Sequence, residues 1–413
     1  MPHEARIFVG IDWGSEIHHT WVTDGDGAAI DHRRFEHSGA GLTALAEWLV
    51  SCAAEPRAII VAIEVPRGPI VETLLERGCQ VWAINPKQLD RFRDRYSVGG
   101  AKDDRRDARV LAQAARTDPS AFRPLDAADP LTAQLRECSR HDAELAADFG
   151  RVANRLRELL LRAWPEVLRL APAADAPWLW TLLARAPTPD AAAALRPAWV
   201  RQLLRRHHIR RWTAEDLLTV LRTPSVHLVA GTREGIAPRI TDLVAQLEVL
   251  HQQRRAAERR LVGLLDALTD DAPPQVGREH PDAVILQSLP GIGIRITGTM
   301  LAEAADMLRR RDYHALRTHT GIAPVTKQSG KTRVVQMRLA CNGRLRDAMF
   351  CWGRSALRDP HVHAHYTRLR AGGHSHARAL RGVVDRLLKV LIVLLTNGQL
   401  YDATRRPSPA PVA

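Results

Sequence analysis

Short apolar runs separated by amphipathic stretches characterise the amino-terminal quarter of the chain. Residues 7–11 and 58–63 are apolar at nearly every position, which predicts strands buried on both faces. A Gly- and Asp-rich turn at residues 24–27 predicts a hairpin after the first strand. Residues 32–37 and 80–84 predict two further strands, and helical patterns fill the later connections. This order predicts a mixed α/β domain that begins with three antiparallel strands.

Three antiparallel strands followed by helical crossover units form the ribonuclease H-like arrangement. We therefore expect a RuvC-like (ribonuclease H-like) α/β domain over residues 1–125. Beyond it, apolar residues recur at three- and four-residue spacing over residues 131–168 and 240–268, which predicts two long helices. Leucines at 243, 247 and 250 follow a rough heptad within the second of these, a pattern that suits an antiparallel coiled-coil arm or a dimer seam.

These patterns divide the remainder of the chain into three parts. We assign residues 126–275 to a helical, coiled-coil arm that carries a basic insert. A Pro-containing linker at residues 271–274 precedes a mostly α-helical carboxy-terminal domain over residues 276–403. The Pro-rich tail, residues 404–413, is expected to be disordered.

The charge balance points to a polyanionic partner. The formal net charge is +13, and only five of the 59 basic residues are lysines. A GC-rich genome exchanges Lys for Arg but does not itself create a basic excess, so nucleic acid is the expected partner. The densest basic patch lies in the insert beside Trp212 and is expected to hold nucleic-acid backbones; it comprises Arg205, Arg206, Arg210 and Arg211.

The sequence shows neither a recognisable signal peptide nor paired cysteines, and we therefore expect an intracellular protein. No leader resembles a signal peptide, and the apolar stretch at residues 387–395 is short and interrupted by Lys389, so a cytoplasmic protein that acts at the nucleoid, without a membrane partner, is expected. The five cysteines contain no CxxC pair, which argues against a disulfide framework or a zinc site. We expect reduced, mostly buried thiols.

Four carboxylates supply the candidate chemistry of the amino-terminal domain. Asp12 closes the first apolar run and Glu64 follows the second, while Asp104 and Asp107 share one face of a predicted helix. Each alone is more simply a strand end or a surface charge. Together they would converge on one edge of the sheet, and hard oxygen ligands are those that Mg²⁺ prefers, with Mn²⁺ as an alternative. Two such ions could assist in-line displacement at phosphorus.

Two glycine-containing turns in the carboxy-terminal part are candidate phosphate contacts. Gly291 and Gly293 stand in a Pro-Gly-Ile-Gly turn before a predicted helix, and could expose N–H groups to a DNA phosphate, although a plain helix–helix turn fits equally well. Ser329 lies in a later loop, and a lone loop serine is usually structural. Its basic neighbours would nevertheless suit a phosphodiester; they are Lys327, Lys331 and Arg333.

Histidines near the carboxy terminus invite a metal interpretation that we reject. His361, His363 and His365 alternate, with His374 and His376 close behind. Alternating histidines suit ligation on a strand, whereas the sequence that follows them is typical of a helix. Phosphate-facing or merely exposed histidines fit better.

The ordered set of these motifs resembles the DEDD-type transposases of the IS-one-ten insertion-sequence family. The strands ending at Asp12 and Glu64, the signature at residues 102–108, the Pro-Gly-Ile-Gly turn and the Ser329 loop occur in one order, and the resemblance extends through residues 341–346 and 366–369. It implies that Asp12, Glu64, Asp104 and Asp107 form an acidic, Mg²⁺-binding tetrad. It also implies that Ser329 is a catalytic serine in a carboxy-terminal transposase domain.

The resemblance implies a DNA recombinase that works through a covalent phosphoserine intermediate. It further implies homodimers and tetramers with composite active sites, and a noncoding bridge RNA that pairs with double-stranded donor and target DNA. One position departs from the family signature, because Asp103 stands where Thr is usual. The extra negative charge is expected to shift metal affinity rather than the reaction.

Three other classes of protein remain open at this point. A RuvC-like hydrolytic nuclease, such as a junction resolvase, would need the carboxylates but no serine. Sugar-kinase and actin-like ATPases also begin with Gly-Ile-Asp-x-Gly, as residues 10–14 do, but no second phosphate loop is found. A non-catalytic nucleic-acid binder would leave the buried carboxylates without a role.

Overall fold

The computed structural model describes residues 6–95, 103–126, 129–270, 280–330 and 332–404. It divides into two compact units, Met1–Asp129 and Pro130–Ala413, and each is described by itself. The finer division with boundaries at residues 125, 275 and 403 stays a prediction. The tail beyond residue 404 lies outside the described residues.

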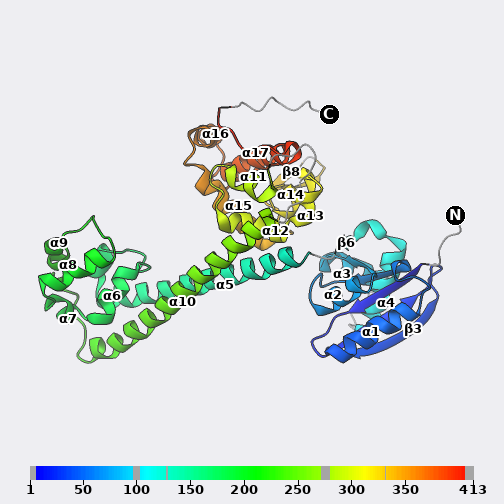
Figure 1. The fold of residues 1–413 in the computed structure, drawn as a ribbon, viewed down its shortest axis with the longest axis horizontal. Helices are drawn as coiled ribbons and strands as arrows, with labels where there is room; N and C mark the ends of the chain where they lie inside the picture. Colours follow the sequence, from blue (N-terminus) through cyan, green and yellow to red (C-terminus); the bar gives the residue numbers. More distant parts are fainter. Residues whose placement is uncertain (1–5, 96–102, 127–128, 271–279, 331, 405–413) are drawn as a thin grey trace. The chain divides into compact units, whose positions relative to one another are not determined.

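The first unit is a six-stranded mixed sheet with helices on both faces (Figure 1). Its strands are β1 (Ile7–Asp12), β2 (Ile17–Thr23), β3 (Ala29–Glu36), β4 (Ile59–Ile63), β5 (Gln80–Ala83) and β6 (Arg123–Leu125), in spatial order β3-β2-β1-β4-β5-β6. Its helices are α1 (Gly39–Ser51), α2 (Pro69–Glu76), α3 (Pro86–Asp94) and α4 (Asp104–Thr117), with short 3-10 turns η1 (Pro56–Ala58) and η2 (Pro119–Ala121). The three antiparallel strands and the two parallel crossovers match the expected order, consistent with a RuvC-like fold. The turn at residues 24–27 joins β2 to β3, so its expected place directly after the first strand is wrong.

Alternate residues of the central strands fill two separate cores. Val9, Ile11 and Val61 pack in the core that also includes residues of α1 and α2. Phe8 and Ile60 point the other way and pack in the core that includes residues of α4. A strand that is apolar on both faces belongs between two helical layers, and β4 is buried at all five positions. Residues 8, 10 and 12 therefore share the α4 face of β1.

The second unit is built on two long helices and is mostly helical. The helix α5 (Pro130–Ala163) and the helix α10 (Thr232–Asp270) run side by side (Figure 1). At one end they share a core with a group of short helices that we call the helical head. It comprises η3 (Pro165–Arg169), α6 (Pro177–Arg185), α7 (Pro189–Ala193), α8 (Pro197–Arg206) and α9 (Ala214–Leu221). The predicted heptad residues Leu243 and Leu247 are buried in the core of this head. Paired long helices are thus present, while coiled-coil packing stays a prediction.

The other end of the helical pair packs against a carboxy-terminal helical domain. Its helices are α11 (Asp282–Ser288), α12 (Ile294–Glu303), α13 (Ala305–Arg309), α14 (Tyr313–His319), α15 (Gly343–Ala356), α16 (Pro360–Ala371) and α17 (His376–Asn397). A core centred on the fully buried Trp352 joins α15 to α17 and α11. Between α14 and α15 stands a two-stranded hairpin, β7 (Val325–Ser329) and β8 (Thr332–Gln336).

Several local expectations can be compared directly with the structure. Residues 361–371 are helical within α16, as expected from the sequence that follows the alternating histidines. The expectation of mostly buried thiols is wrong, because among the five cysteines only Cys79 is buried, where desolvation raises its pKa to about 11. The other four lie on helices, at a helix end or in the Cys341 turn; Cys351 is exposed, and the remaining three are half-buried. No helix in the described ranges combines the length and apolar character needed to cross a membrane.

Candidate active site

The parallel register of β1 and β4 places the first two carboxylates side by side. Gly10 is paired with Ala62 and Ile11 with Ile63, so the next position of each strand brings Asp12 beside Glu64. Both residues continue the series that faces α4, because side chains alternate along a strand. Asp12 and Glu64 are each half-buried. Two carboxylates therefore lie at the carboxyl ends of adjacent strands, on the same face of the sheet.

Helix α4 brings the third carboxylate to this edge by passing unusually close to β1. A Cβ atom on Gly10 would lie 1.9 Å from the carbonyl oxygen of Ala108, so only glycine allows this approach. Ala108 is fully buried, and Asp107 beside it is only 2% exposed. The Gly10 position thus fixes how near the first turns of α4 lie to the strand that ends in Asp12.

Asp103 has a structural role at the start of α4. The carboxylate of Asp103 accepts a hydrogen bond of 3.1 Å from the backbone N–H of Arg105, so Asp103 is the N-cap of this helix. Asp and Thr both cap helices, so the Thr that the resemblance implies at this position would keep the cap. Asp104 follows as the first helical residue and is exposed, one turn before the buried Asp107.

A guanidinium group occupies the space beside the buried carboxylate. Arg93, in the last turn of α3, donates from Nε to Oδ1 of Asp107 at 2.8 Å and from Nη2 to Oδ2 at 2.9 Å. The same Nη2 lies 3.8 Å from Oε2 of Glu64. Burial opposes the charge of Arg93, but the hydrogen bonds and charge of Asp107 outweigh it, so the pKa of Arg93 is above its ordinary value. No local pattern in the sequence marks Arg93, which precedes its partner by 14 residues.

The donor set fits a hard divalent cation by its chemistry. Carboxylate oxygens are the ligands that Mg²⁺ selects, and a carboxylate as buried as Asp107 needs a positive partner. Within the described ranges, however, no three acidic, histidine or cysteine side chains converge closely enough to hold a metal ion. At this edge Arg93 takes both oxygens of Asp107 and lies 3.8 Å from Glu64.

Aromatic and basic residues border the carboxylates on the β2 side. The indole of Trp21 packs against Ala108 and Ala112 of α4. The guanidinium carbons of Arg105 and Arg109 lie 5.5 Å and 5.6 Å from the centre of the Trp21 ring. His19 is paired with Asp12 across β1 and β2 and shares its face. Sequence reasoning missed these neighbours, although the basic positions of the signature could have drawn attention to them.

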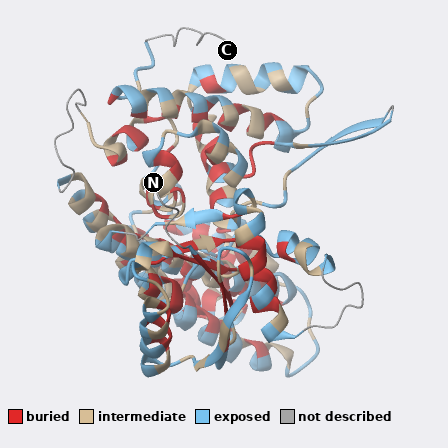
Figure 2. Ribbon diagram, turned by 90° about the vertical axis from the view of Figure 1, so that its right-hand side faces the viewer, coloured by how far each residue is buried: buried red, intermediate tan, exposed pale blue. Residues whose placement is uncertain are grey.

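The candidate serine lies in the second unit, at the end of an exposed hairpin. Both strands of the hairpin are drawn pale blue in Figure 2, and nine of their ten residues are exposed. Ser329 is the last residue of β7 and pairs with Thr332, with Gly330 in the left-handed region at φ 54° between them. Within the described residues the Ser329 hydroxyl has no hydrogen-bond partner. This turn presents a hydroxyl to solvent.

Strand alternation separates the basic neighbours that the sequence grouped around the serine. Lys327 lies two residues before Ser329 and shares its face of the hairpin. Arg333 pairs with Gln328 and therefore faces the opposite side, so the expectation that it contacts the same phosphodiester is not supported by the register. Lys331 lies outside the described residues.

The base of the hairpin is fixed by a buried ion pair that sequence reasoning missed. Glu303, at the end of α12, accepts hydrogen bonds from Arg140 Nε at 2.9 Å and from Asn342 Nδ2 at 3.0 Å. Asn342 also caps α15 through Leu345 N–H. Burial would raise the pKa of Glu303, but the hydrogen bonds from Arg140 and Asn342 outweigh it and lower the pKa. Helix α5 is thereby tied to the segment that follows the hairpin.

The Pro-Gly-Ile-Gly turn has a packing role at one of its two glycines. Gly291 has φ 79°, and a Cβ there would lie 2.4 Å from the backbone nitrogen of Ala356. The indole of Trp352 donates to the carbonyl of Pro290 at 3.0 Å. These contacts explain Gly291 without a phosphate. Gly293 has open space around it and precedes the first residue of α12.

The basic cluster of the helical head is exposed. Arg205 and Arg206 end α8, and Arg210 and Arg211 follow it. Arg211 also donates to the carbonyl of Leu170 at 2.9 Å, which anchors the segment to the head. All four side chains can meet a polyanion, and Arg211 has a structural role as well.

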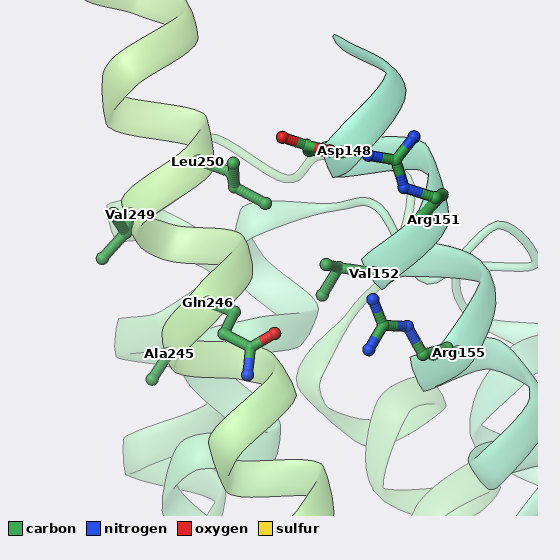
Figure 3. Close-up of a pocket in the computed structure, with 8 residues that line it drawn as sticks. All are labelled: Asp148, Arg151, Val152, Arg155, Ala245, Gln246, Val249 and Leu250. Atoms are coloured by element: carbon green, nitrogen blue, oxygen red, sulfur yellow. Dashed lines mark hydrogen bonds and ion pairs between the residues drawn. The ribbon is translucent and has the colours of Figure 1, made fainter. Parts of the chain in front are cut away.

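A separate hollow lies between the two long helices and holds none of the predicted site residues. Its volume is about 530 Å³, and Figure 3 shows Arg155 and Val152 of α5 facing Gln246 and Leu250 of α10 across it. The hollow is open and mixed in character, so it is a groove in the surface of the helical pair rather than an enclosed ligand site.

Two models of transposase families match this chain. A family model of DEDD-type transposases, described as a transposase, matches residues 9–165. A second model, described as the transposase IS116/IS110/IS902 family, matches residues 283–367. The first match spans the carboxylate edge and the second spans the Ser329 hairpin.

Full-length relatives extend these matches. A candidate transposase for the IS117 mini-circle of Streptomyces coelicolor is 33% identical over 98% of this chain and 97% of its own length. An uncharacterized protein of insertion element IS110 from the same organism is 30% identical over 99% of this chain and 98% of its own. A candidate transposase of Sinorhizobium fredii is 52% identical, but the match covers 52% of this chain and 60% of that protein. The chain belongs to the IS116/IS110/IS902 family of transposases, and is thus an enzyme that acts on DNA.

Proposed function

We propose that this transposase cleaves and rejoins DNA through a covalent intermediate on Ser329, assisted by Mg²⁺ bound by Asp12, Glu64, Asp104 and Asp107. The observation that carries the proposal is the alignment of Asp12 and Glu64 on adjacent strand ends, with the buried Asp107 brought to the same edge by the close approach at Gly10. Mg²⁺, with Mn²⁺ as a substitute, would supply charge neutralisation at the phosphodiester.

The proposed reaction exchanges one phosphoester bond for another and therefore needs no external energy source. The Ser329 oxygen forms a bond to phosphorus while the bond from phosphorus to one bridging deoxyribose oxygen breaks. The serine proton is lost and the leaving deoxyribose oxygen gains one, so one DNA end becomes esterified to the protein. Attack by a hydroxyl of another DNA end reverses the step and restores the serine. Lys327, on the same hairpin face, is suited to hold the phosphate.

A matched pair of hairpin variants tests the nucleophile. Ser329→Ala should abolish strand cleavage and any covalent protein–DNA adduct, measured with a labelled duplex that carries the ends of the element. Thr332→Ala removes a hydroxyl directly across the hairpin from Ser329 and should retain both activities. Unchanged cleavage by the Ser329 variant would show that another group attacks phosphorus.

One observation favours a second function, hydrolytic cleavage by a RuvC-like nuclease. Asp12 and Glu64 already lie on adjacent strand ends, and carboxylates that hold divalent ions can activate water as the attacking group without a serine. Cleavage that persists in Ser329→Ala without an adduct would establish this alternative.

We also propose that a noncoding bridge RNA guides the transposase, and that it acts as a homodimer or tetramer through its arm, a coiled coil of α5 and α10. The net charge of +13 and the exposed arginine cluster of the helical head, Arg205, Arg206, Arg210 and Arg211, support backbone binding of RNA or DNA. Sequencing the RNA that copurifies with the protein from cells carrying its flanking DNA tests this. A discrete RNA that matches the flanks is expected, and heterogeneous RNA would contradict guidance.

A further inference from the structure

We propose that Arg93 is a placeholder cation, which holds the carboxylates together before metal binds and must release Asp107 for a divalent ion to enter. This inference rests on the proposed metal-assisted function. Nothing in the sequence motifs assigns a role to Arg93, and two of its partners, Asp107 and Glu64, belong to the proposed acidic tetrad.

The geometry leaves no oxygen of Asp107 available in this state. The two nitrogens of the Arg93 fork each take one oxygen, at 2.8 Å and 2.9 Å. The Asp107 side chain is 3% exposed, and that of Arg93 is 27% exposed, so the pair is largely withdrawn from water. A ligand for a metal needs a lone pair directed at the ion, which the bidentate pair occupies.

The guanidinium and a divalent ion repel each other at this site. Nη2 of Arg93 lies 3.8 Å from Glu64, so an ion shared by Asp107 and Glu64 would meet the charge of Arg93 at close range. The burial of Asp107 explains why a substitute cation is needed, because an isolated buried carboxylate is costly. For the same reason, a divalent ion would enter by replacing the guanidinium of Arg93, so that Asp107 keeps a positive partner throughout.

The structure provides a second anion to which Arg93 can move. Nη1 of Arg93 already lies 2.6 Å from Oδ1 of Asp90, one turn earlier on α3. The Asp90 side chain is 64% exposed, so it lies toward solvent. Rotation of the Arg93 side chain can release Asp107 while the contact with Asp90 keeps the guanidinium paired.

The proposal predicts two effects of opposite sign for Arg93→Gln. Without metal, the variant should be less stable than the parent, because Asp107 loses its cation. With Mg²⁺, it should bind the ion on the order of tenfold more tightly, because the competing charge is gone. Arg91→Gln is the matched control, since Arg91 lies on the same helix, is exposed and has no described ion pair; it should change neither property.

The test is calorimetric titration of the full chain with MgCl₂, together with thermal unfolding in chelator, for the parent and both variants. Tighter Mg²⁺ binding by Arg93→Gln alone supports the placeholder, and equal or weaker binding by a folded variant overturns it. Should Arg93→Gln not fold without metal, Arg93→Lys keeps the charge but loses the fork, and should bind Mg²⁺ a fewfold more tightly than the parent, with unchanged affinity counting against the proposal. Absence of Mg²⁺ binding in the parent and every folded variant would overturn the metal site itself, and the placeholder with it.

Discussion

The carboxylate edge and the Ser329 hairpin differ in how firmly the fold holds them. Asp107 is 2% exposed and is supported by a helix that contacts the strand backbone at Gly10. Ser329 stands on a hairpin whose residues are nearly all exposed, and a two-stranded hairpin alone is only marginally stable in water. One half of the proposed chemistry is therefore fixed by the core, while the other half depends on the few contacts at the base of the hairpin.

Because the two regions differ in burial, substitutions in them should differ in how much they change stability as well as activity. A substitution at the carboxylate edge changes packing and charge within a core, so it is expected to alter unfolding as well as activity. A substitution on the exposed hairpin removes few contacts, so it should alter chemistry with little effect on global stability. Variants in the two regions therefore test that separation.

Gly10→Ala should destabilise the first unit by more than about 3 kcal/mol, because backbone atoms of α4 cannot move aside for the new Cβ without moving the helix. Thermal or denaturant unfolding measures this. Gly39→Ala, in α1, is the control, since its Cβ would meet nothing within 4 Å and the change should be within about 0.5 kcal/mol. Equal stability of the two variants would contradict the close approach of α4 to β1.

Glu303→Gln should destabilise the base of the hairpin by about 2 kcal/mol at neutral pH, because it removes the charge that pairs with Arg140. The pKa of Glu303 is lowered in the folded protein, so its contribution is fully present above the unfolded value near 4.5. The contribution should be lost as the pH falls from there through the folded pKa.

Unfolding of the parent protein and of Glu303→Gln, each measured from neutral to acidic pH, gives the pH dependence of this stability difference. Glu137→Gln is its control, because Glu137 contacts the same arginine but is 76% exposed. A difference that is independent of pH would show that the charge of Glu303 is not what stabilises this region.

Lys327→Gln should slow adduct formation by about tenfold, because this residue shares the face of Ser329 and would contact the phosphate in the proposed reaction. Arg333→Gln, on the opposite face, should have a smaller effect at saturating DNA. Single-turnover kinetics distinguishes the two. A larger defect in the Arg333 variant would mean that the hairpin presents its other face to the DNA.

Gly330→Ala should destabilise the hairpin locally by about 1 kcal/mol, because Ala disfavours the left-handed conformation at φ 54°. Hydrogen exchange of the β7 and β8 amides should become faster, while the melting temperature of the whole protein stays unchanged. Gly343→Ala, at the start of α15, lacks the positive φ and should leave exchange unchanged. A global loss of stability would contradict the independence of the hairpin.

The sequence predicted the parts of this molecule that depend on local patterns. Two uninterrupted apolar runs defined β1 and β4, and the strand ends at Asp12 and Glu64 followed from them. The third residue of interest, Asp107, could be assigned to a helix face but not to a depth of burial. The short β6 was not predicted, because its three residues include Pro124 and show no alternation.

Long-range pairs account for most of what the sequence did not reveal. Arg140 and Glu303 are 163 residues apart, and no spacing rule joins them. Arg93 and Asp107 meet only because α3 and α4 pack together. The grouping of Arg333 with Ser329 followed proximity in sequence, whereas strand alternation assigns them to opposite faces.

The decisive experiment is to identify the residue that becomes attached to DNA. The full-length protein, incubated with Mg²⁺ and a duplex carrying the element's ends, would be denatured, digested and analysed by mass spectrometry. We expect a nucleotide-modified peptide with the modification on Ser329, present in Thr332→Ala and absent from Ser329→Ala. Cleaved DNA without any modified peptide, or a modification on another residue, would contradict it.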